Sequence, residues 1–235
     1  MGRSRHSPLL DWWRRSFVDT VDHRAVIDKV HEEMRWSAHF AFMTVMSAGI
    51  AVLGLLLSSP AVVIGAMLIS PLMGPIIGFG FGLALFDFAD IRRALFTTAA
   101  GVLLSVLFCT LIVALSPLQT VTPEIAARTR PNLFDLLVAL FSGLAGTYAM
   151  VRGRHGAIVG VAIAVAVMPP LAVMGFGLAT LNATVFWGSS LLFLTNLMTI
   201  GVSAAVLARL YGFGHQLSPR QTGFQATLVL VTFVG

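Results

Sequence analysis

The sequence has 235 residues, of which 57% are hydrophobic and 11% are charged, and its mean hydropathy is +0.89. Soluble domains carry about a quarter charged residues, so this composition excludes an ordinary soluble domain and predicts an all-α integral membrane protein in the lipid bilayer. The formal net charge is +5. In a membrane protein an arginine excess reports topology, so we expect no nucleic-acid partner.

Residues 1–36 precede the first long apolar segment and mix basic with acidic side chains. Within them, four apolar residues recur at helical spacing, with charged residues on the opposite face. These four are Val26, Ile27, Val30 and Met34. We therefore predict a cytoplasmic amphipathic helical segment that packs on a neighbouring subunit or on lipid headgroups.

Six long apolar segments follow, and each approaches the roughly 20 residues that a helix needs to span a bilayer. They lie near 38–57, 60–86, 94–115, 133–151, 156–180 and 184–208. The loop 116–132 contains Thr122-Pro123-Glu124, which is typical of the start of a short helix. Residues 211–235 begin a seventh apolar segment that ends too early to span, so we expect the native protein to continue beyond Gly235.

Two stretches of the chain repeat each other. Residues 61–85 align without a gap with residues 156–180, and the two share the block Gly-Phe-Gly-Leu-Ala and a central proline. We therefore predict two three-helix repeats, residues 37–115 and 133–210. Because each repeat crosses the membrane an odd number of times, the two repeats should have opposite orientations, as in many transporters.

Basic residues predict the orientation of the chain in the membrane. If the N-terminus is cytoplasmic, Arg128 and Arg130 are the only lysine or arginine residues on the outside. Membrane proteins carry their excess of basic residues in cytoplasmic loops. We therefore expect a multi-pass protein of the cytoplasmic (inner) membrane with a cytoplasmic N-terminus and an extracytoplasmic loop at 116–132.

Prolines interrupt the middle segment of each predicted repeat. A proline inside a helix removes one N–H donor and clashes with the carbonyl four residues before it. Lipid cannot satisfy the freed carbonyls, so the breaks must face protein, water or a ligand, and broken ends at mid-membrane can hold an ion or a polar solute. The predicted ligand-binding residues are Ser70, Pro71, Gly74, Pro75, Met168, Pro169, Pro170 and Asn196. The alternative is that neighbouring helices satisfy two ordinary proline kinks.

Polar side chains occur at two further positions in the second repeat. Asn196 lies about midway along its last segment, where the amide needs an interhelical hydrogen bond or a ligand. Asn132 and Asp135 have the spacing of a capping box at the start of the fourth segment. Asp135 could instead pair with Arg128 or Arg130 near the membrane entrance, or bind a proton. We predict Asn132, Asp135 and Arg130 as entrance or capping residues.

Glycines spaced four residues apart form small helix faces that allow close packing. Gly74 with Gly78, and Gly156 with Gly160, are such pairs. Together with the amphipathic N-terminal segment they offer more contact surface than a six- or seven-span monomer needs. We therefore predict a homo-oligomer.

Residue types that carry chemistry are sparse. The single cysteine, Cys109, excludes an internal disulfide, and the six histidines follow no metal-ligand spacing. No two carboxylates share a predicted span, and no nucleophile or phosphate-binding motif occurs. We expect no enzymatic activity, no metal and no cofactor.

Three runs of residues, 63–75, 129–135 and 168–172, resemble those of a family of hydrophobic prokaryotic membrane proteins known as domain of unknown function 389. The resemblance covers roughly residues 37–210. It implies a bacterial or archaeal inner-membrane protein with several spans, and it supplies no substrate, cofactor or catalytic residue.

Two hypotheses follow for the function. The first is a transporter-like or channel-like protein that binds a polar small solute or an ion at the mid-membrane helix breaks. The alternative is a non-transporting membrane scaffold or small-molecule sensor, in which the breaks only determine packing and the N-terminal helix recruits a partner.

Overall fold

The computed structural model describes residues 18, 21–153 and 157–214, and this part of the chain forms nine α-helices and no β-strand. The helices are α2 (His23–Glu33), α3 (Ala38–Leu56), α4 (Pro60–Ile69), α5 (Met73–Leu85), α6 (Phe88–Leu115), α7 (Pro123–Ala126), α8 (Leu133–Val151), α9 (Ala157–Ala179) and α10 (Ala183–Leu210). The predicted seventh segment falls largely outside the described residues.

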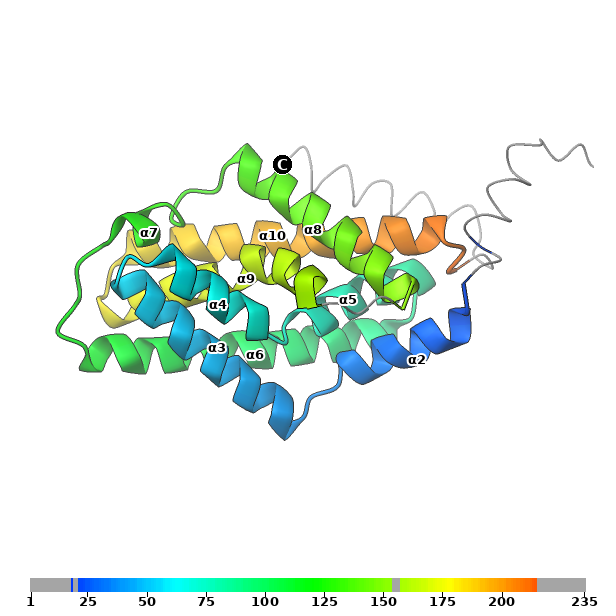
Figure 1. Cartoon of the computed structure of the whole chain (residues 1–235), viewed down its shortest axis with the longest axis horizontal. Coiled ribbons are helices and arrows are strands. Elements are labelled where there is room, and N and C mark those ends of the chain that lie inside the picture. Colours follow the sequence, from blue (N-terminus) through cyan, green and yellow to red (C-terminus); the bar gives the residue numbers. More distant parts are fainter. Residues whose placement is uncertain (1–17, 19–20, 154–156, 215–235) are drawn as a thin grey trace, which may run out of the picture.

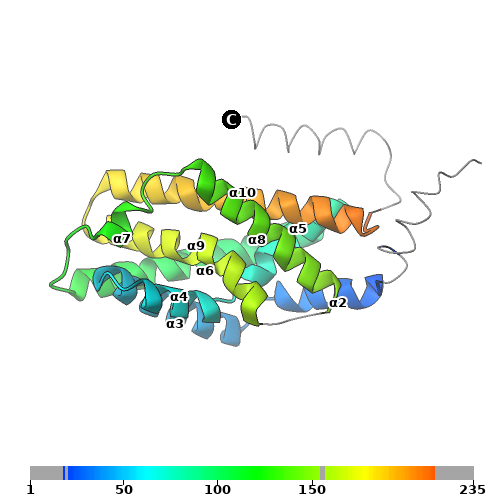
Figure 2. The same ribbon diagram turned by 45° about the horizontal axis from the view of Figure 1, so that its top comes forward.

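The helices form one elongated bundle (Figure 1). The two longest, α6 and α10, run along its long axis in opposite directions, with the short helix α7 at one end and α2 at the other. The view in Figure 2 shows α8 crossing α9 and α10 at an angle, and these helices pack against one another. Residues from α7, α8, α9 and α10 can therefore meet near the α7 end of the bundle.

Several helices are long and apolar enough to cross a membrane. Within the described residues, four helices meet this requirement on their own, namely α3, α6, α8 and α10. The bent pair α4 and α5 meets it together as a fifth span. Because these helices lie side by side in one bundle, the chain is a multi-pass membrane protein.

Capping side chains explain where four of the helices begin. Each cap accepts a hydrogen bond from a first-turn N–H group that has no partner inside the helix. The caps are Ser37 for α3, Asp87 for α6, Asn132 for α8 and Asn182 for α10. The cap at Asp87 starts α6 at Phe88, so the predicted start of this segment near residue 94 was too late and left Asp90 out of the helix.

The middle segment of the first half is broken, as predicted. Helix α4 ends at Ile69 and α5 begins at Met73, with a bend of 58° between them. Ser70 has an extended backbone with ψ 124°, which is the conformation that a following proline favours. Pro71 therefore causes the break. Pro75 lies in the first turn of α5, where its missing N–H would have no intrahelical partner.

The corresponding segment of the second half is not broken. Helix α9 continues through Pro169 and Pro170, so the prediction of two proline-broken middle helices is wrong for this copy. A proline at position 170 frees the carbonyl of Ala166, four residues earlier. The side-chain amide of Asn196 donates a hydrogen bond to that carbonyl at 2.8 Å. The neighbouring helix thus supplies the donor that Pro170 lacks, and the α9 helix continues.

The amphipathic face predicted before the membrane is present in α2. Val26, Val30 and Met34 are at most 6% exposed, and α2 packs on α5 of the same chain. A Cβ atom on Gly74 would meet the backbone carbonyl of Glu33 at the end of α2. The apolar face of α2 is therefore buried within this chain rather than against a neighbouring subunit or lipid headgroups, and Gly74 allows the close approach.

Candidate functional site

A cavity of about 310 Å³ lies near the α7 end of the bundle, between α7, α8, α9, α10 and the end of α4. We call it the Asn196 cavity. Its lining residues are Met67, Glu124, Ala127, Arg128, Asp135, Val138, Ala166, Pro170, Leu192 and Asn196. Carboxylate, guanidinium and amide groups therefore meet in a space large enough for a small solute.

Asn196 is the deepest polar side chain of this cavity and is only 3% exposed. Its Nδ2 atom donates to the carbonyl of Ala166. Its Oδ1 atom is buried and has no hydrogen-bond partner among the described residues. A buried acceptor without a partner costs about 1–3 kcal/mol. Water or a ligand with an N–H or O–H group could pair with this oxygen.

The carbonyl of Ala166 adds a second acceptor to the same wall. Pro170 leaves this carbonyl without its helical N–H partner, and Asn196 provides one donor instead. A carbonyl oxygen has two lone pairs, so it can accept a further hydrogen bond. Pro170 thus leaves, in a residue of the cavity wall, a carbonyl that can accept a second hydrogen bond, and it does so without ending the helix.

Charged groups line the cavity nearer the surface. The guanidinium of Arg128 donates to the carboxylate of Glu124 at 2.7 Å. The carboxylate of Asp135 accepts from the backbone N–H of Asn132, and the side chain of Asn132 accepts from the backbone N–H of Asp135. The predicted capping box is therefore confirmed. Arg128 pairs with Glu124 rather than with Asp135, and Arg130 is exposed outside the lining.

The structure brings together only part of the predicted ligand-binding set. Pro170 and Asn196 line the Asn196 cavity. Met168 and Pro169 are buried in α9 but do not reach this cavity. The residues of the first break lie apart from it: Ser70, Pro71, Gly74 and Pro75 are all missing from its lining. Gly74 instead contacts the end of α2.

Sequence reasoning did not identify Glu124 and Arg128 as residues of the cavity. They lie four residues apart, the spacing at which opposite charges pair on a helix. That spacing was a usable signal, but it could not show that these two residues line one cavity with residues of α8 and α9. Within the described part of the chain, no three histidine, cysteine or acidic side chains come together as metal ligands would.

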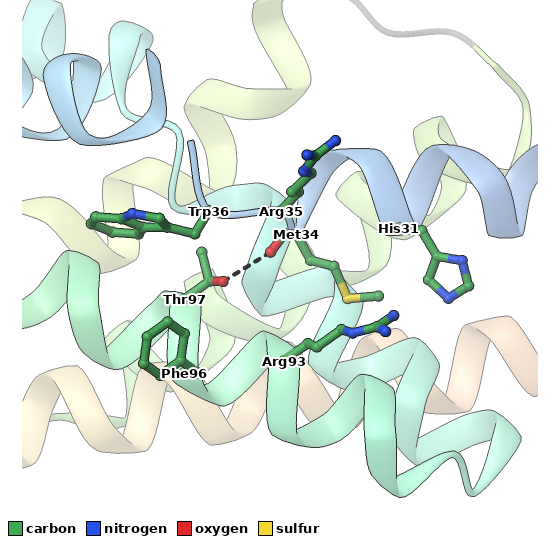
Figure 3. A pocket seen from close by; sticks show the side chains of 7 residues that line it. All are labelled: His31, Met34, Arg35, Trp36, Arg93, Phe96 and Thr97. Atoms are coloured by element: carbon green, nitrogen blue, oxygen red, sulfur yellow. Dashed lines mark hydrogen bonds between the residues drawn. The ribbon is translucent and has the colours of Figure 1, made fainter. Parts of the chain in front are cut away.

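A second cavity, of about 460 Å³, lies where the C-terminal end of α2 meets α6 (Figure 3). We call it the α2–α6 cavity. It is lined by His31, Met34, Arg35, Trp36, Arg93, Phe96 and Thr97. It therefore combines basic and aromatic side chains, unlike the Asn196 cavity.

Two contacts join the segments on either side of this second cavity. The hydroxyl of Thr97 donates to the backbone carbonyl of Met34 at 2.9 Å (Figure 3). The ring Nε2 of His31 is 2.8 Å from the carboxylate of Asp90. Asp90 is only 7% exposed, so this contact joins α2 to α6 through a buried carboxylate.

The comparisons with known proteins identify a family. The family described as Domain of unknown function (DUF389) matches residues 67–202. A relative from Methanocaldococcus jannaschii, named Uncharacterized protein MJ0678, is 28% identical over 170 residues, which cover 72% of this chain and 53% of the relative. The chain thus spans about half the length of that curated relative, and no solved structure matches it. The matched region runs from α4 to α10, and the chain belongs to the DUF389 family.

Proposed function

We propose that this protein is a transporter-like or channel-like membrane protein that binds a small polar solute or ion in the Asn196 cavity. The observation that carries the proposal is the buried Oδ1 atom of Asn196, which has no partner in the described structure. Polar side chains inside membrane segments are costly, and those that line a cavity mark substrate or ion pathways. A bound solute would supply the missing hydrogen bond.

The lining groups indicate the chemistry of this solute. Asn196 Oδ1 and the carbonyl of Ala166 are both acceptors. Among the charged groups, the carboxylates of Glu124 and Asp135 outnumber the guanidinium of Arg128. A group with hydrogen-bond donors and a positive charge fits such a lining. We therefore propose a small ammonium or amine compound, or a monovalent cation, as the solute.

We also propose that residues 37–115 and 133–210 are inverted three-helix repeats. The support comes from pairs of residues that are separated along the chain by the same number of positions as Pro75 and Pro170. The two members of each pair have matching surroundings. In each proposed repeat, a glycine of the middle helix contacts the last helix of the other repeat. The contacts are Gly80 with Gly201 and Ala204 of α10, and Gly175 with Val106 and Cys109 of α6. The residues that Gly80 contacts and the residues that Gly175 contacts therefore correspond one to one, with the same separation along the chain as Pro75 and Pro170.

The backbone conformation supports the same relationship. Phe86 ends α5 with φ 56°, and Leu181, which follows α9, has φ 53°. Non-glycine residues rarely adopt this left-handed conformation. These two residues are separated along the chain by the same number of positions as Pro75 and Pro170.

A superposition of the two halves in an experimental structure tests the proposal of inverted repeats. A rotation axis along the membrane normal would contradict it.

The arrangement of basic residues supports a cytoplasmic N-terminus in the inner membrane. Arg92 lies near the start of α6, Arg152 directly after α8 and Arg209 near the end of α10, and these helix ends point toward the α2 end of the bundle, whereas Arg128 directly follows the α7 turn at the other end (Figure 1). The end with more arginines faces the cytoplasm in most membrane proteins. A homo-oligomer stays a proposal. Because α2 of the same chain covers Gly74 and Gly78, contacts between the subunits of such an oligomer would use other surfaces.

A thermal-unfolding screen of the purified full-length protein tests solute binding. Ammonium, methylammonium and potassium chlorides serve as cationic probes, and acetate and phosphate, supplied with the same bulky organic cation as the buffer, serve as anionic probes. A ligand that binds only the folded state raises the apparent stability. We expect a cationic probe to raise the unfolding midpoint of the wild type, and the shift to disappear in Asn196→Ala.

Two further variants complete this test. Val138→Phe fills the cavity from its half-exposed rim without removing a hydrogen bond, so it should also abolish the shift. Pro75→Ala is the matched control because Pro75 lies outside the cavity, and its shift should equal that of the wild type. A shift that persists in both cavity variants, or that only anionic probes produce, contradicts the proposal.

Flux separates transport from the alternative function. Proteoliposomes that contain the full-length protein should take up radiolabelled methylammonium faster than protein-free vesicles, and Asn196→Ala should abolish the difference. Binding without flux would instead indicate the alternative, a small-molecule sensor in the membrane.

A further inference from the structure

We propose that the α2–α6 cavity binds the phosphate headgroup of an anionic membrane phospholipid. This site is separate from the Asn196 cavity and does not depend on the function proposed above. It lies along the lower side of the bundle in Figure 1, where the chain passes from α2 into the membrane helix α3. A basic pocket at this boundary is a recognised kind of site for anionic lipid headgroups.

The charge of the cavity is positive. Arg35 and Arg93 both line it. Asp90, which contacts His31 and Arg93, is already hydrogen-bonded to His31 at 2.8 Å and is 3.8 Å from the guanidinium of Arg93. The Arg93 side chain is 67% exposed, so its planar donors are free to bind a phosphate in a two-pronged manner.

The order of the side chains matches the order of groups in a lipid. Trp36 and Phe96 lie at one end of the cavity and His31 at the other, with Arg93 between them (Figure 3). Phe96 is three residues further along α6 than Arg93, which places it about 4.5 Å further along the helix axis at about 1.5 Å per residue. A phosphate beside Arg93 would therefore place the glycerol and the acyl chains beside the aromatic rings.

An apolar track continues from Phe96 along the outside of α6. Phe96, Leu103 and Leu107 are 65%, 61% and 53% exposed. Their spacing places them on one face of the helix. An acyl chain that follows this face would remain in contact with apolar side chains below the headgroup. A soluble phosphate would gain nothing from these residues.

The cavity is built by two segments that are held in place. Thr97 on α6 donates to the carbonyl of Met34, and this contact joins the segment carrying Arg35 and Trp36 to the helix carrying Arg93. Basic side chains from two separate segments therefore line one cavity, whereas a simple positive-inside charge run would lie along one segment. This shared lining is what distinguishes a binding site from a general topological signal.

Lipid titration of the purified full-length protein tests the proposal. Phosphatidylglycerol or phosphatidylcholine is added to the detergent-solubilised protein, and binding is followed by native mass spectrometry and by the unfolding midpoint. We expect phosphatidylglycerol to bind more tightly and to raise the midpoint more. The double variant Arg35→Gln/Arg93→Gln should weaken phosphatidylglycerol binding by about tenfold or more. The matched control is Arg24→Gln/Arg92→Gln, which removes the same charge from exposed positions outside the cavity and should bind like the wild type.

Further measurements distinguish a lipid phosphate from a soluble phosphate as the ligand of this cavity. Inorganic phosphate and glycerol 3-phosphate, added without lipid, should give no shift at the concentration where the lipid gives one. Phe96→Ser should weaken lipid binding because it removes an apolar contact at an exposed position. A shift with the soluble phosphates that requires the same arginines would overturn the lipid assignment. Equal binding of both lipids, or equal binding by the Arg35/Arg93 variant and its control, would overturn the site.

Discussion

The side-chain amide of Asn196 donates a hydrogen bond to the backbone carbonyl of Ala166 at 2.8 Å, which joins the middle of α10 to α9. This carbonyl lacks its usual hydrogen bond within α9 because Pro170 has no N–H group. One interhelical bond therefore repairs the defect that a proline introduces. The oxygen of the same side-chain amide, Oδ1, has no hydrogen-bond partner in the described structure, and this side chain lines the cavity.

The repair should be measurable as an energetic coupling between Asn196 and Pro170. In the wild type, Asn196→Ala should lower the free energy of unfolding by about 1–2 kcal/mol, since a buried carbonyl loses its donor. In a Pro170→Ala background the helix supplies that donor itself, so the same change should cost less. Urea or thermal unfolding of the four proteins in detergent measures the coupling. Thr195→Ala is the control, because the Thr195 hydroxyl bonds within α10 to Leu191. Equal costs in both backgrounds would show that Asn196 does not compensate for the proline.

Glycines at helix contacts should be intolerant of even one added methyl group. Gly80→Ala and Gly175→Ala would each force a Cβ atom against a neighbouring backbone, so we expect a loss of about 1–3 kcal/mol in unfolding free energy. Gly65→Ala should instead stabilise by about 0.5–1 kcal/mol, because nothing lies within 4 Å of its Cβ position. Thermal unfolding measures all three. A neutral Gly80→Ala or Gly175→Ala would contradict the packing described here.

Docking of α2 should depend on Gly74. In Gly74→Leu the new side chain would collide with the carbonyl of Glu33, and α2 should separate from α5. Limited trypsin digestion should then cut at Arg35 faster than in the wild type. Gly65→Leu introduces the same side chain on α4 where space is open, and its digestion should match the wild type. Unchanged cleavage of Gly74→Leu would mean that α2 does not need this close contact.

Orientation can be checked with introduced cysteines in intact cells. Cys109 is fully buried and should not react with an impermeant thiol reagent. Val121→Cys, at the α7 end, should label, and Arg92→Cys, at the α2 end, should label only after the membrane is permeabilised. Both positions are exposed, so accessibility reports the side of the membrane. The opposite pattern would reverse the proposed topology.

The sequence by itself determined the class of the protein and most helix positions. Apolar composition and segment length depend on each segment alone, so they predicted a membrane protein of α-helices without any tertiary information. The capping box of Asn132 and Asp135 was predictable for the same reason, since its two hydrogen bonds join residues three apart. The break after Ser70 also follows from the residue next to it, Pro71.

Only the tertiary structure decided which prolines break a helix and which residues share a cavity. Pro169 and Pro170 look like a break in the sequence, yet α9 is continuous because Asn196 reaches Ala166 from another helix. Glu124 joins Pro170 in one cavity although the two are far apart in the chain. Such contacts depend on how whole helices pack, and packing joins residues whose separation along the chain leaves no local pattern to read.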